Sequence, residues 1–123
     1  MADLFDIVVA RKLSGGGGGG GSWTVLTEES VTVGGEGGRL TYNTQITADA
    51  IKVTLNGTEY TVSPSVDTSP FGTSYTYGAQ FSEELDRYDY STYPFSVVST
   101  PNGANTLHTE TAGTYTIKIE VPA

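Results

Sequence analysis

Residues 50–62 read AIKVTLNGTEYTV, and this stretch carries the clearest local signal in the chain. Ile51, Val53 and Leu55 alternate with Lys52 and Thr54, which is the period of a strand with one buried face. Asn56-Gly57 follows, and the pair is typical of a two-residue hairpin turn because both residues tolerate a positive φ. A second alternating segment, Thr58 to Val62, completes the pattern. The stretch therefore predicts a β-hairpin.

Segments of the same kind recur on both sides of this hairpin. They cover residues 23–26, 30–33, 39–46, 75–81, 95–99, 106–109 and 114–121. Strands at intervals of about 8–12 residues, with little helical periodicity, indicate an all-β fold built as a single antiparallel β-sandwich. We expect Ser63–Ser74, with its two prolines, to be a loop, and one helical turn around Glu83-Glu84-Leu85.

The kind of sandwich has two candidates. Ala112-Gly113-Thr114-Tyr115 resembles the run into a late strand of immunoglobulin-like sandwiches, where a tyrosine packs at a corner. A jelly roll is the rival, and both stay open at this point.

Seven consecutive glycines, residues 15–21, divide the chain into three parts. We expect residues 1–14 to be a docking segment, residues 15–21 to be a flexible linker, and residues 22–123 to be the β-sandwich domain. The docking side chains of the first part are Leu4, Phe5, Ile7, Val8, Val9 and Leu13. Their spacing, with Asp3 as N-cap, favours a short helix, and an extended arm that adds to a sheet edge is the alternative.

Charge is distributed unevenly along the chain. The net charge is −8, and residues 1–13 are balanced, so the domain carries all of it. Such a surface repels phosphate backbones, which argues against nucleic acid as a partner. We expect no membrane span, because no apolar run approaches 18 residues, and no secretory leader, because the N-terminus lacks a basic region.

The residues that could carry chemistry are few. There is no cysteine, His108 is the only histidine, and no Gly-x-Ser-x-Gly motif occurs, so we expect a protein that is not an enzyme and needs no cofactor. Oxygen ligands cluster at Glu83, Glu84, Asp86 and Asp89, a weak calcium candidate whose spacing does not match an EF-hand loop. A solvated acidic loop is the simpler interpretation, and we expect no metal site.

Tyrosines are concentrated in the same region. Tyr88, Tyr90 and Tyr93 could stack on sugars or on a partner protein, because a phenol ring offers a rigid apolar face with a polar tip. The alternative is that these rings pack the loop down onto the domain.

The order of the first 22 residues resembles a known arrangement. Leu4 to Ser14, followed by polyglycine and Ser22, is similar to the N-termini of accessory virion proteins of tailed bacteriophages that infect gut bacteria. The resemblance implies a head-fibre or capsid-decoration protein, assembled in the host cytoplasm, that docks through its N-terminus on the capsid or another virion protein. The alternative is a tail-associated or surface adhesin that binds host glycan through its tyrosine-rich loops.

Several copies are expected on a symmetric particle. Three glycine helices packed side by side would give a trimer, which is our expectation for the homo-oligomer.

Overall fold

The computed structural model describes residues 22–123, and every regular element in that range is a β-strand. The strands are β2 (Trp23–Val33), β3 (Gly38–Arg39), β4 (Ile51–Leu55), β5 (Thr58–Val62), β6 (Pro64–Ser69), β7 (Gly72–Gly78), β8 (Gln80–Ser82), β9 (Arg87–Asp89), β10 (Phe95–Ser99), β11 (Asn105–Thr109) and β12 (Gly113–Pro122). Each of their pairings is antiparallel. The expected all-β, antiparallel fold is confirmed.

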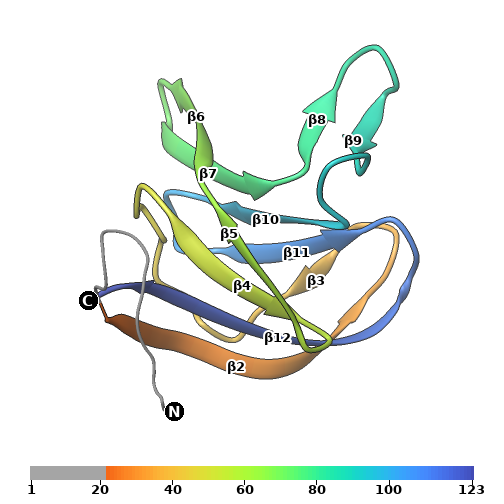
Figure 1. Cartoon of the computed structure of the whole chain (residues 1–123). Coiled ribbons are helices and arrows are strands. Elements are labelled where there is room, and N and C mark those ends of the chain that lie inside the picture. The colour runs from red at the N-terminus through yellow and green to blue at the C-terminus, as the bar shows by residue number, and fades with distance from the viewer. Residues whose placement is uncertain (1–21) are drawn as a thin grey trace.

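The strands form two main sheets and one separate hairpin. A four-stranded sheet has the order β2-β12-β4-β5, and a five-stranded sheet has the order β3-β11-β10-β7-β6. The hairpin β8–β9 projects on the same side of the molecule as the β6–β7 hairpin (Figure 1). Buried side chains from both main sheets belong to one hydrophobic cluster, so the arrangement is sandwich-like.

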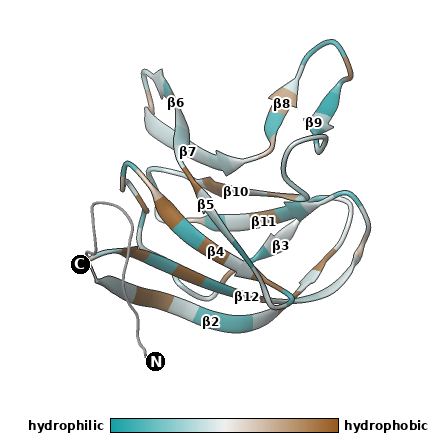
Figure 2. Ribbon diagram, in the orientation of Figure 1, coloured by the Kyte–Doolittle hydropathy of each residue, from teal (hydrophilic) through white to brown (hydrophobic). Residues whose placement is uncertain are grey.

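Alternation along the strands builds this core. On β4, Ile51 and Val53 are fully buried, while Lys52 between them points outward. On β12, Ile117 and Ile119 are likewise buried, with the outward-pointing Lys118 between them. Figure 2 shows the alternation along both strands. The opposite sheet contributes Tyr77, Phe95, Val97 and Leu107. Full burial of such a side chain contributes about 1.5–3 kcal/mol, so these inward-facing positions hold the two sheets together.

The hairpin at residues 51–62 forms as expected. Leu55 pairs with Thr58, and the turn residues Asn56 and Gly57 have φ values of 49° and 87°. The Asn56 backbone N–H donates to the Thr116 carbonyl at 2.9 Å, and the Asn56 side-chain oxygen accepts from the Thr116 N–H at 2.9 Å. The turn is therefore tied to β12 in addition to its own two strands.

The prediction of a loop at residues 63–74 is wrong, because most of this segment forms the β6–β7 hairpin. Pro64 is the first residue of β6, and β6 pairs only with β7 at the edge of its sheet. Proline is tolerated at that place because the missing N–H is not needed for pairing. Pro70 lies in the two-residue turn before Gly72.

The expected helical turn around Glu83-Glu84-Leu85 is also wrong. Residues 83–86 form the turn that joins β8 to β9, and Asp86 has a φ of 57° there. The strand expected over 39–46 is shorter, since β3 ends at Arg39, although Leu40 and Ile46 still enter the core. The range 22–123 has no helix long and apolar enough to cross a membrane.

Both ends of the described chain lie together. The Ala123 N–H donates to the Ser22 carbonyl at 3.0 Å, beside the paired ends of β2 and β12 (Figure 1). Ser22, the first described residue, therefore lies next to the C-terminal residue.

Candidate functional site

An open cleft lies between the β8–β9 hairpin, the turn after β2 and the end of β11. Its volume is about 350 Å³. It is lined by Gly34, Gly35, Phe81, Arg87, Tyr88, Tyr90, His108, Thr109 and Glu110. These residues come from three parts of the chain that are far apart in sequence. Pairing of β3 with β11 brings the turn after β2 to the site, and ring stacking of Tyr88 on His108 brings the β8–β9 hairpin there.

Backbone geometry positions the β8–β9 hairpin over the cleft. Gly78, at the end of β7, has a φ of 94°, and a Cβ there would come within 2.6 Å of the Phe95 carbonyl oxygen. The next residue, Ala79, is buried and donates its N–H to that same carbonyl at 2.8 Å. Glycine is required at residue 78 because only it fits both the left-handed backbone and the close approach.

Two stacked rings join the hairpin to the five-stranded sheet. Tyr88 of β9 stacks on His108 of β11, with ring centroids 4.8 Å apart and an interplanar angle of 26°. Burial lowers the pKa of His108 and raises the pKa of Tyr88. Both rings are therefore neutral at neutral pH, and the base of the cleft carries no charge from them.

Two further aromatic rings extend this cluster. Phe81 meets Tyr88 edge to face with centroids 5.6 Å apart, and Tyr90 lies 6.2 Å from Tyr88. Phe81 is 54% exposed, so much of its ring faces solvent. Burial is the main cause of a raised pKa at Tyr90, which keeps that hydroxyl protonated. The cluster offers an open apolar surface next to phenol hydroxyls.

Charged groups of opposite sign stand at the rim. The Arg87 guanidinium lies 3.7 Å from the Glu110 carboxylate, and more than half of each side chain is exposed. An ion pair this exposed contributes little to stability, about 0–1 kcal/mol. Both groups consequently remain available to hydrogen-bond a ligand.

The glycine turn closes the cleft opposite the hairpin. Gly34 and Gly37 exchange two backbone hydrogen bonds, of 3.3 Å and 3.1 Å. A Cβ on Gly37 would approach the His108 ring to 2.9 Å, so this glycine lets the turn pack against the imidazole. Gly34 and Gly35 have open space where a side chain would project, so the turn lines the cleft with backbone alone.

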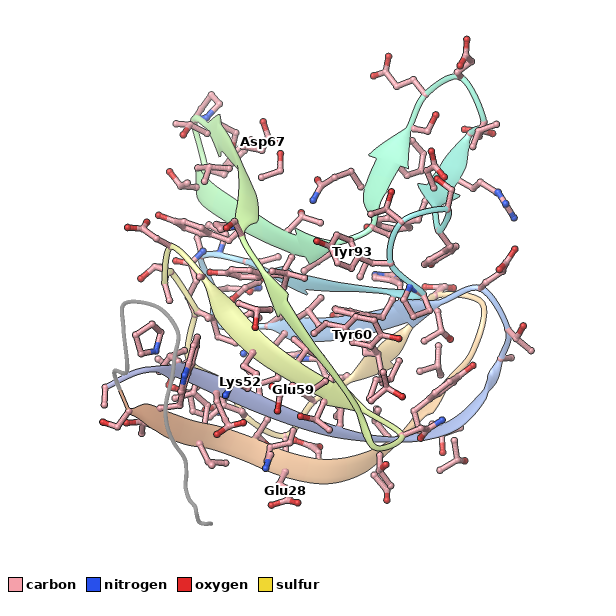
Figure 3. The ribbon with its side chains drawn as sticks, in the orientation of Figure 1. Glu28, Lys52, Glu59, Tyr60, Asp67 and Tyr93 are labelled. Atoms are coloured by element: carbon pink, nitrogen blue, oxygen red, sulfur yellow. The ribbon has the colours of Figure 1, made fainter. Side chains whose placement is uncertain are left out.

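The three tyrosines predicted as a ligand site are divided by the structure. Tyr88 and Tyr90 lie together in the cleft, whereas Tyr93 packs on the sandwich against Tyr60 and Phe95, with centroids 6.3 Å and 6.1 Å away (Figure 3). Tyr93 therefore has the packing role that the alternative interpretation described.

The acidic residues do not converge. Among residues 22–123, no group of three or more acidic, histidine or cysteine side chains is placed to hold a metal ion. Glu83, Glu84 and Asp86 occupy the exposed β8–β9 turn. The Asp89 carboxylate accepts the Ser91 N–H at 3.0 Å, and hydrogen bonding with Ser91 lowers the pKa of Asp89.

The predicted docking side chains lie outside the described residues. These are Leu4, Phe5, Ile7, Val8, Val9 and Leu13.

Sequence reasoning missed most of the cleft. No sequence pattern groups Phe81, Glu110 and the glycine turn at residues 34–37 into one site, and His108 stands out only as the single histidine. One signal was present: His108 alternates with the buried Leu107, which places it on the outer face of its strand.

The chain matches no protein-family model, no curated protein and no solved structure.

Proposed function

We propose that this protein is a non-catalytic accessory component of a virion, of the head-fibre or capsid-decoration type. Residues 1–14 attach it to the capsid or another virion protein, residues 15–21 bridge, and the acidic domain projects outward. The observation that carries the proposal is the charge-neutral apolar segment separated by seven glycines from a domain of net charge −8.

The linker gives the domain limited freedom. Seven residues span at most about 23–25 Å when fully extended. Ser22, the first residue after the glycines, lies beside the C-terminus, whereas the cleft-forming hairpin β8–β9 stands away from that end (Figure 1). Attachment through the N-terminus thus leaves the cleft accessible.

Strand order supports a jelly roll over an immunoglobulin-like sandwich. Among the described strands the first pairs with the last, β2 with β12, and the second with the last but one, β3 with β11. Nested pairing is the pattern of a jelly roll, while an immunoglobulin constant-type sandwich has its first and last strands in different sheets. The feature that supports the immunoglobulin-like alternative is the Tyr115 hydroxyl, which donates to the Thr111 carbonyl as in a tyrosine corner.

A double substitution in the full-length protein tests the attachment. Phe5→Asp with Val8→Asp should abolish co-sedimentation with virus particles in a density gradient, because two carboxylates cannot enter an apolar groove. Val66→Asp with Phe71→Asp is the matched control, since both residues are exposed hydrophobic residues of the domain. Particle binding that survives the first pair of substitutions would reject the proposal.

The cleft supports a second candidate function, an adhesin that binds host glycan. Its basis is an exposed Phe81 ring beside Tyr88 and Tyr90, with polar groups at the rim. Apolar rings combined with a few convergent polar groups are typical of small-ligand sites. This function is compatible with the first, because a virion component can also bind a cell surface.

A further inference from the structure

We infer that the cleft binds an uncharged pyranose residue. This inference depends on the second candidate function, glycan binding, and specifies which class of sugar the site accepts. A charged sugar or a purely apolar ligand fits the residues that line the cleft less well than an uncharged pyranose does.

The apolar component of the site is Phe81. A pyranose ring presents C–H groups on one face, and an exposed aromatic ring offers them a complementary surface. Tyr88 is half-buried and has its own ring stacked on His108, so it supports Phe81 from below instead of competing for the ligand. Phe81 therefore provides the stacking surface, on a hairpin whose position is set by the Tyr88–His108 pair.

The polar components match sugar hydroxyls. Arg87 is a planar donor and Glu110 a planar acceptor, and they stand 3.7 Å apart at one rim. Two neighbouring hydroxyl groups can donate to the carboxylate and accept from the guanidinium at the same time. The Tyr90 hydroxyl and the backbone of Gly35 add further hydrogen-bonding groups around the cleft.

Charge selects against acidic sugars. Arg87 and Glu110 cancel, and His108 and Tyr88 are neutral, so the cleft has no net charge. The chain has a net charge of −8, all of it from the domain around the cleft, which repels a carboxylate approaching from solution. An uncharged ligand meets neither obstacle.

Size limits the ligand to a short saccharide. At about 350 Å³, the cleft lies near the lower end of the range of about 300–1,000 Å³ for small-molecule sites. A short saccharide therefore suits this volume, and a longer chain would extend from the open side.

Proton NMR titration of the full-length protein tests the inference. The probes are glucose, galactose, mannose and N-acetylglucosamine, compared with glucuronic acid and N-acetylneuraminic acid. His108 is the only histidine, so its ring protons report on the cleft without ambiguity. We expect at least one uncharged sugar to shift them in a saturable way, with both acidic sugars about tenfold weaker or undetectable.

Two substitutions of phenylalanine locate the binding surface. Phe81→Ala should weaken binding of the uncharged sugar about tenfold, through loss of ring stacking. Phe71→Ala is the matched control, because Phe71 is 92% exposed on the β6–β7 hairpin and lies outside the cleft. This variant should bind the uncharged sugar with unchanged affinity. Glu110→Gln provides a second test, since it replaces an exposed, charged rim acceptor by a neutral amide that keeps one acceptor oxygen and gains an N–H donor. It should weaken the uncharged sugar and strengthen glucuronic acid.

The outcomes distinguish a wrong class of sugar from a protein that binds no glycan. Binding of acidic sugars alone would overturn the inference and leave glycan binding standing. Equal losses for Phe81→Ala and Phe71→Ala would also overturn it, because the bound sugar would then lie elsewhere. Absence of binding by all six sugars would reject both the inference and the glycan function, while virion attachment would be unaffected.

Discussion

Asn105 is a fully buried polar side chain at the edge of the apolar core. Its amide donates to the carbonyls of Tyr42 and Thr44, at 2.8 Å and 3.0 Å, and its side-chain oxygen accepts from the Ser99 hydroxyl at 2.5 Å. Ser99 in turn accepts the Ile46 N–H at 2.7 Å. These bonds hold the irregular segment 40–50 against the five-stranded sheet, where no strand pairing is available to do so.

Replacement of this amide should be costly. We expect Asn105→Leu to lower the free energy of unfolding by about 2–4 kcal/mol, because several buried polar groups lose their partners together. Urea denaturation monitored by Trp23 fluorescence gives the measurement. Asn43→Ala, at an exposed position of the same segment, is the control and should change stability by less than about 0.5 kcal/mol. Equal effects of the two substitutions would show that the amide network does not matter.

His108 should make stability depend on pH. Burial lowers its pKa below the ordinary value of 6.5, so below about pH 6.5 the unfolded chain binds a proton that the folded chain resists. The free energy of unfolding should therefore fall between about pH 7.5 and about pH 5.5, and fall less in His108→Gln. Urea denaturation of both proteins at the two pH values measures the difference. Identical pH dependence in both would contradict the expectation.

Turn chemistry decides the hairpins at the scale of secondary structure. The β4–β5 turn uses positive φ at both Asn56 and Gly57, which matches the twist of the flanking strands. The turn of β8–β9 places Asp86 at a φ of 57°, a conformation that a carboxyl side chain tolerates better than most. These short loops determine which strands become neighbours.

Two glycine-to-alanine substitutions separate backbone strain from steric crowding. Gly57→Ala should destabilise the protein by about 1 kcal/mol or more, because its φ is 87° although no atom lies within 4 Å of the added Cβ. Gly113→Ala, at an ordinary φ with only Tyr115 3.8 Å away, should be neutral or stabilising. Thermal denaturation of both variants is the measurement, and a stability loss in Gly113→Ala equal to that in Gly57→Ala would contradict this account.

At the scale of the whole molecule, negative charge is spread widely. Figure 3 places Glu28 on β2 and Asp67 on β6, at opposite ends of the domain. Among the described residues, three ion pairs occur, all involving partly or largely exposed side chains: Lys52–Glu59, Arg87–Glu110 and Lys118–Glu120. The remaining acids repel one another across the surface.

Salt should therefore stabilise this domain. Raising NaCl from about 0.05 M to about 0.5 M shortens the screening length and weakens the self-repulsion of a −8 molecule more than it weakens three ion pairs. The midpoint of urea denaturation should rise, while the slope m stays constant. A midpoint that falls with salt would mean that attractive pairs dominate.

The local elements were largely predictable from sequence, while the site was not. Alternation identified β4, β5, β10, β11 and β12, because the period of two depends only on which face is buried. The prolines of residues 63–74 predicted a loop where β6 forms, since a strand tolerates proline only at a sheet edge, and the edge position of β6 is a property of the tertiary structure. Similarly, Tyr93 looked equivalent to Tyr88 in sequence, and only packing on Tyr60 distinguishes it.

By itself, the sequence determined the all-β class, the hairpin at residues 51–62 and the concentration of negative charge after the glycines. These properties follow from local periodicity, turn residues and composition. Only the tertiary structure decided that Gly34, Tyr88 and His108 surround one cleft, and that the two ends of the domain lie side by side. The physical reason is that long-range strand pairing sets these neighbours, and no local pattern encodes which distant strands will pair.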